Sequence, residues 1–332
     1  MKVGGKTSKA ENMKNIIKNN MAKIRVLIVG SRGMLGQELV NTFKKDGDYK
    51  VTGWDKEEID ITSQKQVEQK IKKLSPNIII NAVAYNAVDK CEEDKKEFEL
   101  AKKINGLAPG YLARATKKVG AVFIHYSSDY VFDGSPDIPE PAGCAGRCLS
   151  CELHKDFTPE IGFDEEAKPN PISNYGKSKL LGEVAAQKAG GKNYIIRLSK
   201  LFGKPAKSND AKKSFFDVIL EVGRKNKEVK VVDEETSCFT YAPDLAKKTK
   251  EIIESRKLSG IYHIVNSDPC TWYEAVIELY KQTKIKTKII PVDADEFPRP
   301  AKRPHISTLI NTKLNPLRSY KAALKDYLKD LE

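Results

Sequence analysis

Short apolar runs alternate with longer amphipathic segments along most of the chain. The first strongly apolar run covers 24–29, and similar runs follow at 50–54, 78–81, 121–126 and 194–197. Segments of helical periodicity, such as 93–118, lie between them. This alternation is typical of βαβ units. We therefore predict an α/β fold with a Rossmann-type, doubly wound parallel sheet.

The alternation becomes less regular after residue 200, where we expect helices at 214–225 and 243–256 and strands at 260–265 and 288–292. We predict a dinucleotide-binding domain over 21–200, with 229–265 returning to its sheet. A smaller C-terminal substrate-binding lobe would consist of 201–228 and 266–332. The segment 134–171, rich in Pro, Gly and acidic residues, is too long for an ordinary connection and is interpreted as an insert.

Charge and hydropathy narrow the class of protein. The net charge of +13 comes mostly from lysines spread along the chain, which is typical of a solvated surface and argues against a nucleic-acid partner. No run approaches the roughly 20 apolar residues of a membrane span. Residues 1–20 lack the apolar centre of a secretory signal and are interpreted as a disordered basic tail. We expect a cytoplasmic protein without a membrane partner, and homodimer formation stays open.

A glycine-rich turn follows the first strand directly. Its glycines are Gly30, Gly33 and Gly36, and a helix is expected immediately after them. Glycine allows a tight turn, close approach of backbone N–H groups to a pyrophosphate, and packing of the helix on the strand. The spacing GxxGxxG differs from the usual GxGxxG, and a purely structural turn is the alternative. The position of the turn favours dinucleotide binding, with Arg32, Met34 and Leu35 beside the cofactor.

Asp55 closes the second strand about 20 residues after the glycines, where a carboxylate can accept hydrogen bonds from the adenosine ribose. This favours NADH over NADPH. Arg32 and Lys56 oppose that preference, because either side chain could neutralise a 2′-phosphate.

Tyr175 and Lys179 lie four residues apart in an amphipathic segment, so a helix projects both from the same face. A lysine ammonium beside a phenol favours the phenolate, which makes the tyrosine a usable proton donor to a carbonyl that receives hydride. Ser128, at a strand end, would hydrogen-bond the developing alkoxide. A second pair, Tyr280 with Lys284, has the same spacing but lacks this context.

Asn105, in the helix before the strand that ends at Ser128, could extend a proton relay through water. A solvated asparagine on the helix surface is the alternative.

Three segments around these residues resemble the dTDP-4-dehydrorhamnose reductase family of extended short-chain dehydrogenases: HYSSDYVFDG (125–134), YGKSKLLGE (175–183) and NAVAYNAVDKCE (81–92). The likeness extends from Met21 to near the C-terminus and implies reduction of dTDP-4-dehydro-6-deoxy-L-mannose to dTDP-L-rhamnose. Around the cofactor it implies Gly33, Met34, Leu35, Asp55, Asp60, Ile61, Val83, Ala84, Tyr85, Tyr126, Tyr175 and Lys179. It implies that Ser128 and Asp129 face the sugar and that Arg303 approaches the nucleotide part of the substrate, where its fork of donors suits phosphate.

Two departures affect the expected sugar site. Lys200 stands where the family usually has Trp, and lysine offers no flat apolar surface to a sugar. Ser237 and Phe239 replace the usual Gly and Pro of another loop. The catalytic group is intact while the substrate wall is altered, so the sugar is open to change.

The insert carries Cys144, Cys148, Cys151 and His154 within eleven residues. Three thiolates and an imidazole suit a closed tetrahedral zinc site, and a metal would stabilise a segment with little apolar content. Free or redox-active thiols are the alternative. CxxxCxxC spacing also occurs in radical iron–sulfur enzymes, but the dinucleotide fold argues against that chemistry. Cys91, Cys238 and Cys270 are interpreted as ordinary buried residues.

Two other functions stay open beside the reductase. One is a non-catalytic regulatory or binding protein, because the beta subunit of methionine adenosyltransferase resembles the same family. The other is a different nucleotide-sugar reductase or epimerase. Ser128, Tyr175 and Lys179 favour catalysis, whereas Lys200 and the insert favour a changed role.

Overall fold

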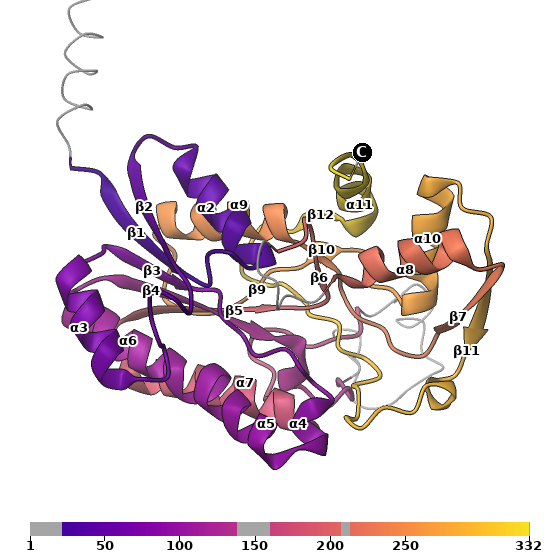
Figure 1. Cartoon of the computed structure of the whole chain (residues 1–332), viewed down its shortest axis with the longest axis horizontal. Helices are drawn as coiled ribbons and strands as arrows, with labels where there is room; N and C mark the ends of the chain where they lie inside the picture. The colour runs from indigo at the N-terminus through magenta and orange to yellow at the C-terminus, as the bar shows by residue number, and fades with distance from the viewer. Residues whose placement is uncertain (1–21, 138–159, 207–212, 332) are drawn as a thin grey trace, which may run out of the picture.

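The structure is a computed structural model in which residues 22–137, 160–206 and 213–331 are described. Its centre is a six-stranded parallel sheet of strand order β2-β1-β3-β4-β5-β9 (Figure 1). The strands are β1 Ile24–Val29, β2 Tyr49–Trp54, β3 Ile78–Asn81, β4 Val122–Ser128, β5 Lys192–Leu198 and β9 Gly260–His263. This architecture confirms the predicted Rossmann-type sheet.

The strand order reverses at β1, because β2 lies on one side of it and β3 on the other. In open parallel sheets such a reversal leaves a crevice at the carboxyl ends of the strands, and ligands bind there. The glycine-rich turn leaves β1 at this point.

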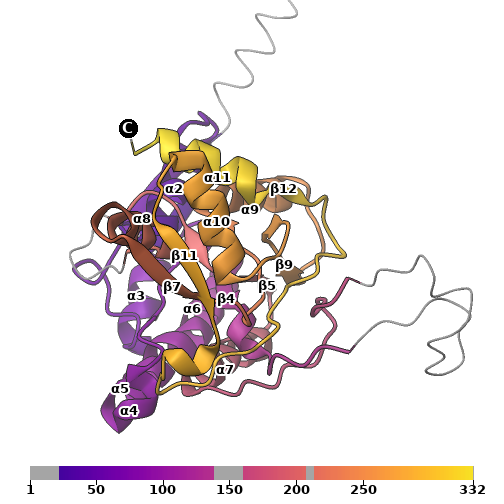
Figure 2. The same cartoon turned by 90° about the vertical axis from the view of Figure 1, so that its right-hand side faces the viewer.

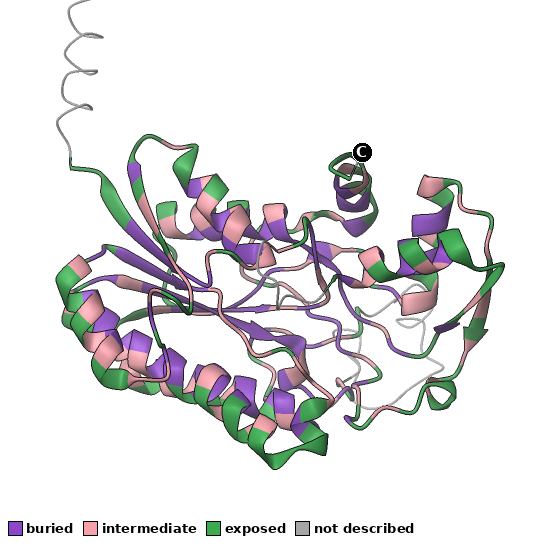
Figure 3. Cartoon of the chain, viewed as in Figure 1, coloured by how far each residue is buried: buried purple, intermediate pink, exposed green. Residues whose placement is uncertain are grey.

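Helices cover both faces of the sheet (Figure 1). On β1, Val26 and Ile28 pack toward one face and Leu27 and Val29 toward the other, and all four are buried. The strands of the central sheet are largely buried between the helices (Figure 3). A strand covered on both sides is expected to read as a continuous apolar run. One layer contains α2 Met34–Lys44 and α9 Ala242–Glu254, and the other contains α3 Gln64–Leu74, α6 Ala108–Lys118 and α7 Asn174–Ala189.

A second core is rich in aromatic side chains and lies at the other end of the molecule (Figure 1), the end that faces the viewer in Figure 2. It includes Phe202, Phe216, Phe239, Tyr320 and Tyr327, all almost completely buried. The surrounding elements are β6 Leu201–Phe202, α8 Phe215–Lys225, β7 Glu228–Val232, β8 Thr240–Tyr241, β10 Asn266–Ser267, α10 Trp272–Thr283, β11 Lys288–Val292, β12 Leu317–Ser319 and α11 Tyr320–Lys329.

One expectation about the segment 229–265 is wrong. β9 joins the main sheet beside β5, but β7 pairs with β11 in a separate two-stranded sheet. Only Val231 and Val232 of β7 are buried, so this strand does not suit the interior of a sheet that is covered on both faces. The division of the chain into two domains stays a prediction.

The helical segment predicted over 93–118 is confirmed from Lys95 onward, with a break at Asp94. Asp94 has an extended backbone, ends α4 Lys90–Glu93 and accepts a hydrogen bond from the Lys96 N–H as the N-cap of α5 Lys95–Ala101. A π-helix, Lys102–Leu107, then leads into α6. Short polar side chains that bond neighbouring backbone compete with helix continuation, which explains the break at Asp94.

Within the described ranges, no helix is long and apolar enough to cross a bilayer.

Candidate active site

The glycine-rich turn between β1 and α2 has no room for side chains at two positions. Gly30 has φ +83°, and a Cβ there would lie 3.0 Å from the backbone of Ala82. A Cβ on Gly36 would lie 1.9 Å from the Gly30 carbonyl oxygen. Gly33 is the N-cap of α2, and no side chain caps that helix. The turn therefore fits the backbone cradle that a dinucleotide pyrophosphate requires at a helix N-terminus.

Asp55 and Arg32 tie the turn to the end of β2. The Asp55 carboxylate accepts hydrogen bonds from the Ser31 hydroxyl at 2.7 Å and from the Arg32 N–H at 3.0 Å. The Arg32 guanidinium donates to Glu57 at 2.9 Å and to Glu58 at 3.0 Å. A ribose phosphate that approached Arg32 would have to compete with these two carboxylates.

The other residues expected beside the cofactor follow β2 and β3. Asp60 accepts a 2.7 Å hydrogen bond from the Thr62 hydroxyl, and Ile61 is buried against α3. Val83 and Ala84 are partly exposed directly after β3, and a Val83 methyl lies 3.0 Å from the Cβ position of Gly30. Leu35 points into the core, and Met34 is partly exposed.

Asn105 is buried within the π-helix and is not a surface residue, which corrects one of the two readings of the sequence. Its carboxamide accepts from the Tyr85 N–H at 2.8 Å and donates to the Tyr85 carbonyl and the Ser178 hydroxyl, both at 3.0 Å. Both N–H groups of the side chain are thus engaged, and Asn105 fixes the backbone after β3 against α7.

Tyr175 and Lys179 lie in the first turns of α7, and both are buried. The helix begins where the Ser173 hydroxyl accepts the Gly176 N–H at 3.1 Å. A Cβ on Gly176 would lie 2.1 Å from the Tyr130 carbonyl oxygen, and one on Gly182 would lie 2.0 Å from that of Asn105. These close approaches fix α7 along its length.

Burial shapes the electrostatics of this pair. It raises the pKa of Tyr175, while a hydrogen bond with Ser128 acts in the opposite direction. It lowers the pKa of Lys179 to about 8, opposed by the charge of Glu183. Lys179 Nζ donates to the Tyr126 carbonyl at 2.6 Å. The Tyr126 side chain points away from this pair, since its hydroxyl is 2.8 Å from that of Thr249 on α9.

Ser128 and Asp129 form a buried polar cluster at the end of β4. The Asp129 carboxylate accepts hydrogen bonds from three hydroxyls: Ser128 at 2.8 Å, Ser199 at 2.8 Å and Ser307 at 2.7 Å. Burial raises the pKa of Asp129, and these three bonds act in the opposite direction. The Ser128 oxygen also accepts the Tyr130 N–H at 3.2 Å.

Lys200 and Arg303 each lie near an aromatic ring. Lys200 Nζ is 3.6 Å from the centroid of the Trp272 ring. The Arg303 guanidinium is 5.8 Å from the Tyr130 ring and donates to both carboxylate oxygens of Asp89, at 2.8 and 2.9 Å. Tyr130 in turn packs edge-on against Tyr175, with 5.5 Å between ring centroids. Arg303 is therefore near Tyr175 but already forms an ion pair with Asp89.

Several polar partners were not anticipated from the sequence. Ser199 and Ser307 bind Asp129, and Asp89 binds Arg303. The Tyr175 hydroxyl is 3.5 Å from the Asn86 carboxamide oxygen. Asn86 and Asp89 both lie in the family-like segment 81–92, which was the available signal for them.

Tyr280 is buried and donates to the Ile219 carbonyl at 3.1 Å, and Lys284 is the left-handed C-cap of α10, so this pair lies in the aromatic lobe away from Ser128. Cys91, Cys238 and Cys270 are buried, as expected.

The predicted metal ligands Cys144, Cys148, Cys151 and His154 lie outside the described residues, so the metal site remains a prediction. The described part of the chain contains no group of three or more His, Cys, Asp or Glu side chains that could hold a metal ion. The ends of the insert are described: Phe163 stacks on Phe132 with 4.2 Å between ring centroids.

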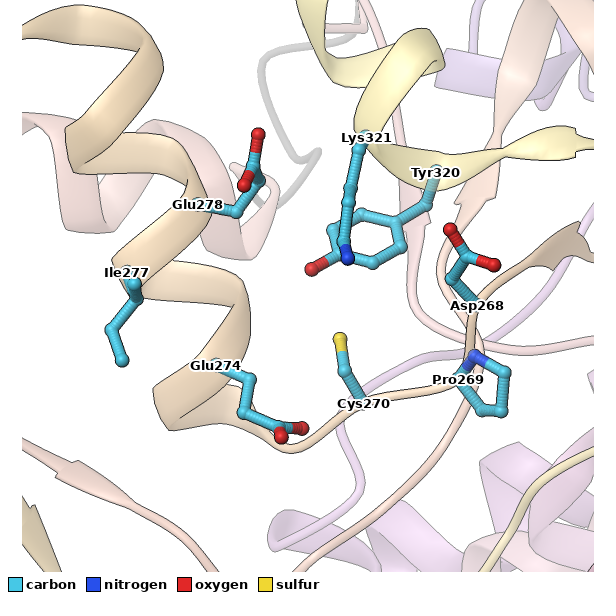
Figure 4. Close-up of a pocket in the computed structure, with 8 residues that line it drawn as sticks. All are labelled: Asp268, Pro269, Cys270, Glu274, Ile277, Glu278, Tyr320 and Lys321. Atoms are coloured by element: carbon cyan, nitrogen blue, oxygen red, sulfur yellow. The ribbon is translucent and has the colours of Figure 1, made fainter. Parts of the chain in front are cut away.

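A pocket of about 240 Å³ lies between α10 and α11, with Cys270 and Lys321 among its lining residues (Figure 4). It contains none of the residues expected to bind cofactor or sugar. Burial raises the pKa of the Cys270 thiol to about 11, which makes it a poor nucleophile.

Comparison with known proteins agrees with this geometry. Residues 24–332 match the model of the RmlD substrate binding domain family. The spore coat polysaccharide biosynthesis protein SpsK of Bacillus subtilis is 29% identical over 310 residues, covering 92% of this chain and 97% of that protein.

Two solved structures are also similar. A dTDP-4-dehydrorhamnose reductase of Clostridium acetobutylicum is 33% identical, with a TM-score of 0.79 and coverage of 92% of this chain and 99% of that one. A dTDP-4-dehydrorhamnose reductase of Bacillus anthracis, solved in complex with NADP, is 30% identical, with a TM-score of 0.79 and coverage of 93% and 100%. The chain therefore belongs to the dTDP-4-dehydrorhamnose reductase family, defined by the RmlD substrate binding domain, whose members are nicotinamide-dependent oxidoreductases.

Proposed function

We propose that this protein reduces the 4-keto group of a nucleotide-activated deoxysugar with NAD(P)H, converting dTDP-4-dehydro-6-deoxy-L-mannose to dTDP-L-rhamnose. The observation that carries the proposal is the buried Tyr175 phenol, which lies one helical turn before Lys179 and whose pKa the Ser128 side chain lowers against the effect of burial. Ser128 ends β4 and the glycine-rich turn follows β1, so both lie at the carboxyl edge of the same parallel sheet. The similar proteins of Clostridium acetobutylicum and Bacillus anthracis are both named as reductases of this substrate, which supports the proposal.

Each side chain has a distinct part in this reaction. Tyr175 is protonated at neutral pH, since burial raises its pKa, and it donates that proton to the carbonyl oxygen of the sugar. Ser128 orients the phenol. The Lys179 ammonium stabilises the phenolate that remains, and its bond to Tyr126 uses only one of its three protons. A bound reduced nicotinamide would supply the hydride.

We further propose a preference for NADH. The Arg32 guanidinium is held by Glu57 and Glu58, and Asp55 stands at the end of β2, so acidic side chains surround the position expected for the adenosine ribose. A 2′-phosphate would meet this charge. The similar protein of Bacillus anthracis was solved with NADP, so the two cofactors must be compared directly in this chain.

The test is oxidation of NADH and NADPH, followed by absorbance, against a panel of nucleotide-linked 4-keto sugars. We expect turnover with dTDP-4-dehydro-6-deoxy-L-mannose, a product identified as dTDP-L-rhamnose, and a higher kcat/KM with NADH. Oxidation of neither cofactor with any sugar of the panel would contradict the proposal and favour a non-catalytic binding role. Turnover of a different sugar would keep the reductase and correct its substrate.

A further inference from the structure

Lys200 connects β5 to β6 in an unusual backbone conformation. Its φ is +35°, a left-handed backbone value that residues other than glycine rarely adopt. The Lys200 carbonyl accepts the Thr240 N–H at 3.2 Å, and the Ser199 carbonyl accepts the Thr240 hydroxyl at 2.6 Å. The surrounding hydrogen bonds hold Lys200 in place despite the strain.

The Lys200 ammonium has no hydrogen-bond partner within the described ranges, although its Nζ atom is shielded from solvent. It lies 3.6 Å from the centroid of the Trp272 ring and 5.2 Å from that of Phe239. These aromatic faces attract the cation, but they satisfy none of its three N–H donors. A buried ammonium without acceptors is costly, and such groups deserve an explanation.

Nearby carboxylates are already engaged by other donors. Asp129 accepts three serine hydroxyls. Glu235 accepts the Trp272 indole N–H at 2.9 Å and forms an ion pair with Arg299. The charges of both carboxylates act on Lys200 across the cluster without a direct contact. Neither carboxylate therefore serves as a hydrogen-bond acceptor for the Lys200 ammonium.

We infer that Lys200 is a specificity-determining residue, whose ammonium donates a hydrogen bond to an oxygen substituent of the substrate's sugar. The inference rests on the proposed reduction of a nucleotide-linked keto sugar. Ser199, the preceding residue, bonds the same Asp129 carboxylate as Ser128, which places Lys200 beside the catalytic group. The acceptor is a sugar hydroxyl or a sugar carboxylate, and both share the chemistry of an oxygen that accepts from an ammonium.

A purely structural role would not require the charge. Methionine has a similar length, is apolar and packs well on aromatic rings, so it would cover Trp272 without a buried cation. If Lys200 serves the sugar, its removal should leave the fold at least as stable while affinity for the sugar falls. These opposite effects distinguish a specificity residue from a packing residue.

The experiment compares the wild type with Lys200→Met and Lys200→Arg, and Lys200→Gln replaces the first if it does not fold. Lys230→Met, at an exposed ion pair, controls for the loss of a lysine. Calorimetric titration in the presence of oxidised cofactor measures binding of dTDP-L-rhamnose, dTDP-glucose and UDP-glucuronate against dTDP and UDP. The affinity of each sugar nucleotide relative to its nucleotide isolates the contribution of the sugar.

We expect Lys200→Met to weaken the sugar contribution by about 10-fold or more, because a bond to a charged group is lost, while binding of dTDP and UDP is unchanged. Lys200→Arg should retain part of it, and Lys230→Met all of it. A wild-type preference for UDP-glucuronate would identify a carboxylate as the acceptor, and one for a neutral sugar a hydroxyl.

If the preferred sugar is not rhamnose and Lys200→Met abolishes that preference, the inference holds and only the proposed substrate is wrong. An unchanged sugar contribution in Lys200→Met, or a wild type that gains nothing from any of the three sugars, overturns the inference. A fall in the melting temperature of Lys200→Met by several degrees also overturns it, since Lys200 would then be structural.

Discussion

The cofactor end and the sugar end of this site are built on different principles. The cofactor end is a contiguous turn, residues 30–36. Its conformation requires glycine, since a Cβ on Gly36 would lie 1.9 Å from a carbonyl oxygen. The sugar end gathers side chains from four distant segments around Asp129 and Lys200. At the cofactor end, steric exclusion leaves no choice but glycine. At the sugar end, the polar residues can be substituted one at a time.

Tyr175 stands between the two ends, and its removal should have the largest effect. In Tyr175→Phe the reduction should fall at least about 100-fold, because the proton donor is lost, while cofactor affinity stays nearly unchanged. Steady-state reduction and fluorescence titration with NADH measure the two effects. Tyr280→Phe, the other tyrosine of a YxxxK pair, should keep its activity within a few-fold. Retention of more than a few per cent of the rate by Tyr175→Phe would remove it from this role.

Gly36→Ala tests the steric principle of the cofactor end. The added methyl group cannot coexist with the Gly30 carbonyl, so we expect a loss of roughly 1–3 kcal/mol in the free energy of unfolding and at least a tenfold weaker affinity for NADH. Gly47→Ala, where no heavy atom lies within 4 Å of the new Cβ, is the matched control. Denaturant unfolding and cofactor titration are the measurements. Equal behaviour of the two variants would show that the turn adapts.

Lys200→Met tests the polar principle of the sugar end through pH. Burial lowers the pKa of Lys200 from 10.5 to about 8, while the charges of Asp129 and Glu235 raise it. Below pH 8 the folded protein bears the full cost of the buried charge, so Lys200→Met should be more stable by on the order of 1–3 kcal/mol.

Between pH 8 and 10.5 the unfolded chain keeps a proton on Lys200 that the folded chain has released. The free energy of unfolding of the wild type therefore rises with pH relative to that of the variant. The difference should therefore shrink over this window. Denaturant unfolding at pH 7, 8.5 and 10 measures it, with Lys230→Met as the control. A difference that grows with pH would refute the assignment.

Glu57→Gln should have the smallest effect, because exposed ion pairs contribute about 0–1 kcal/mol. It releases one of the two carboxylates that hold Arg32, so kcat/KM for NADPH should rise about two- to fivefold while that for NADH stays constant. Glu99→Gln, at an exposed pair with Lys102, is the control. No change in the ratio of the two cofactors would indicate that Arg32 does not contact the ribose region.

The sequence predicts the cofactor end better than the sugar end for a physical reason. A strand buried on both faces, a glycine turn and a Tyr–Lys pair one helical turn apart are local patterns, and local patterns follow from backbone geometry. Ser199 and Ser307 lie 70 and 178 residues from Asp129, so no local pattern could connect them. Asn105 was open to two readings because the π-helix shifts the face that a regular helix would present.

The glycines of α7 have a consequence for how this protein could be redesigned. Gly176 and Gly182 press the helix against the Tyr130 and Asn105 carbonyls, so Tyr175 cannot slide along its axis. Neither of these close approaches involves the loops that carry Lys200 and Ser307. The loops that carry Lys200 and Ser307 can therefore be exchanged by design while Tyr175, the proton donor, keeps its position on α7.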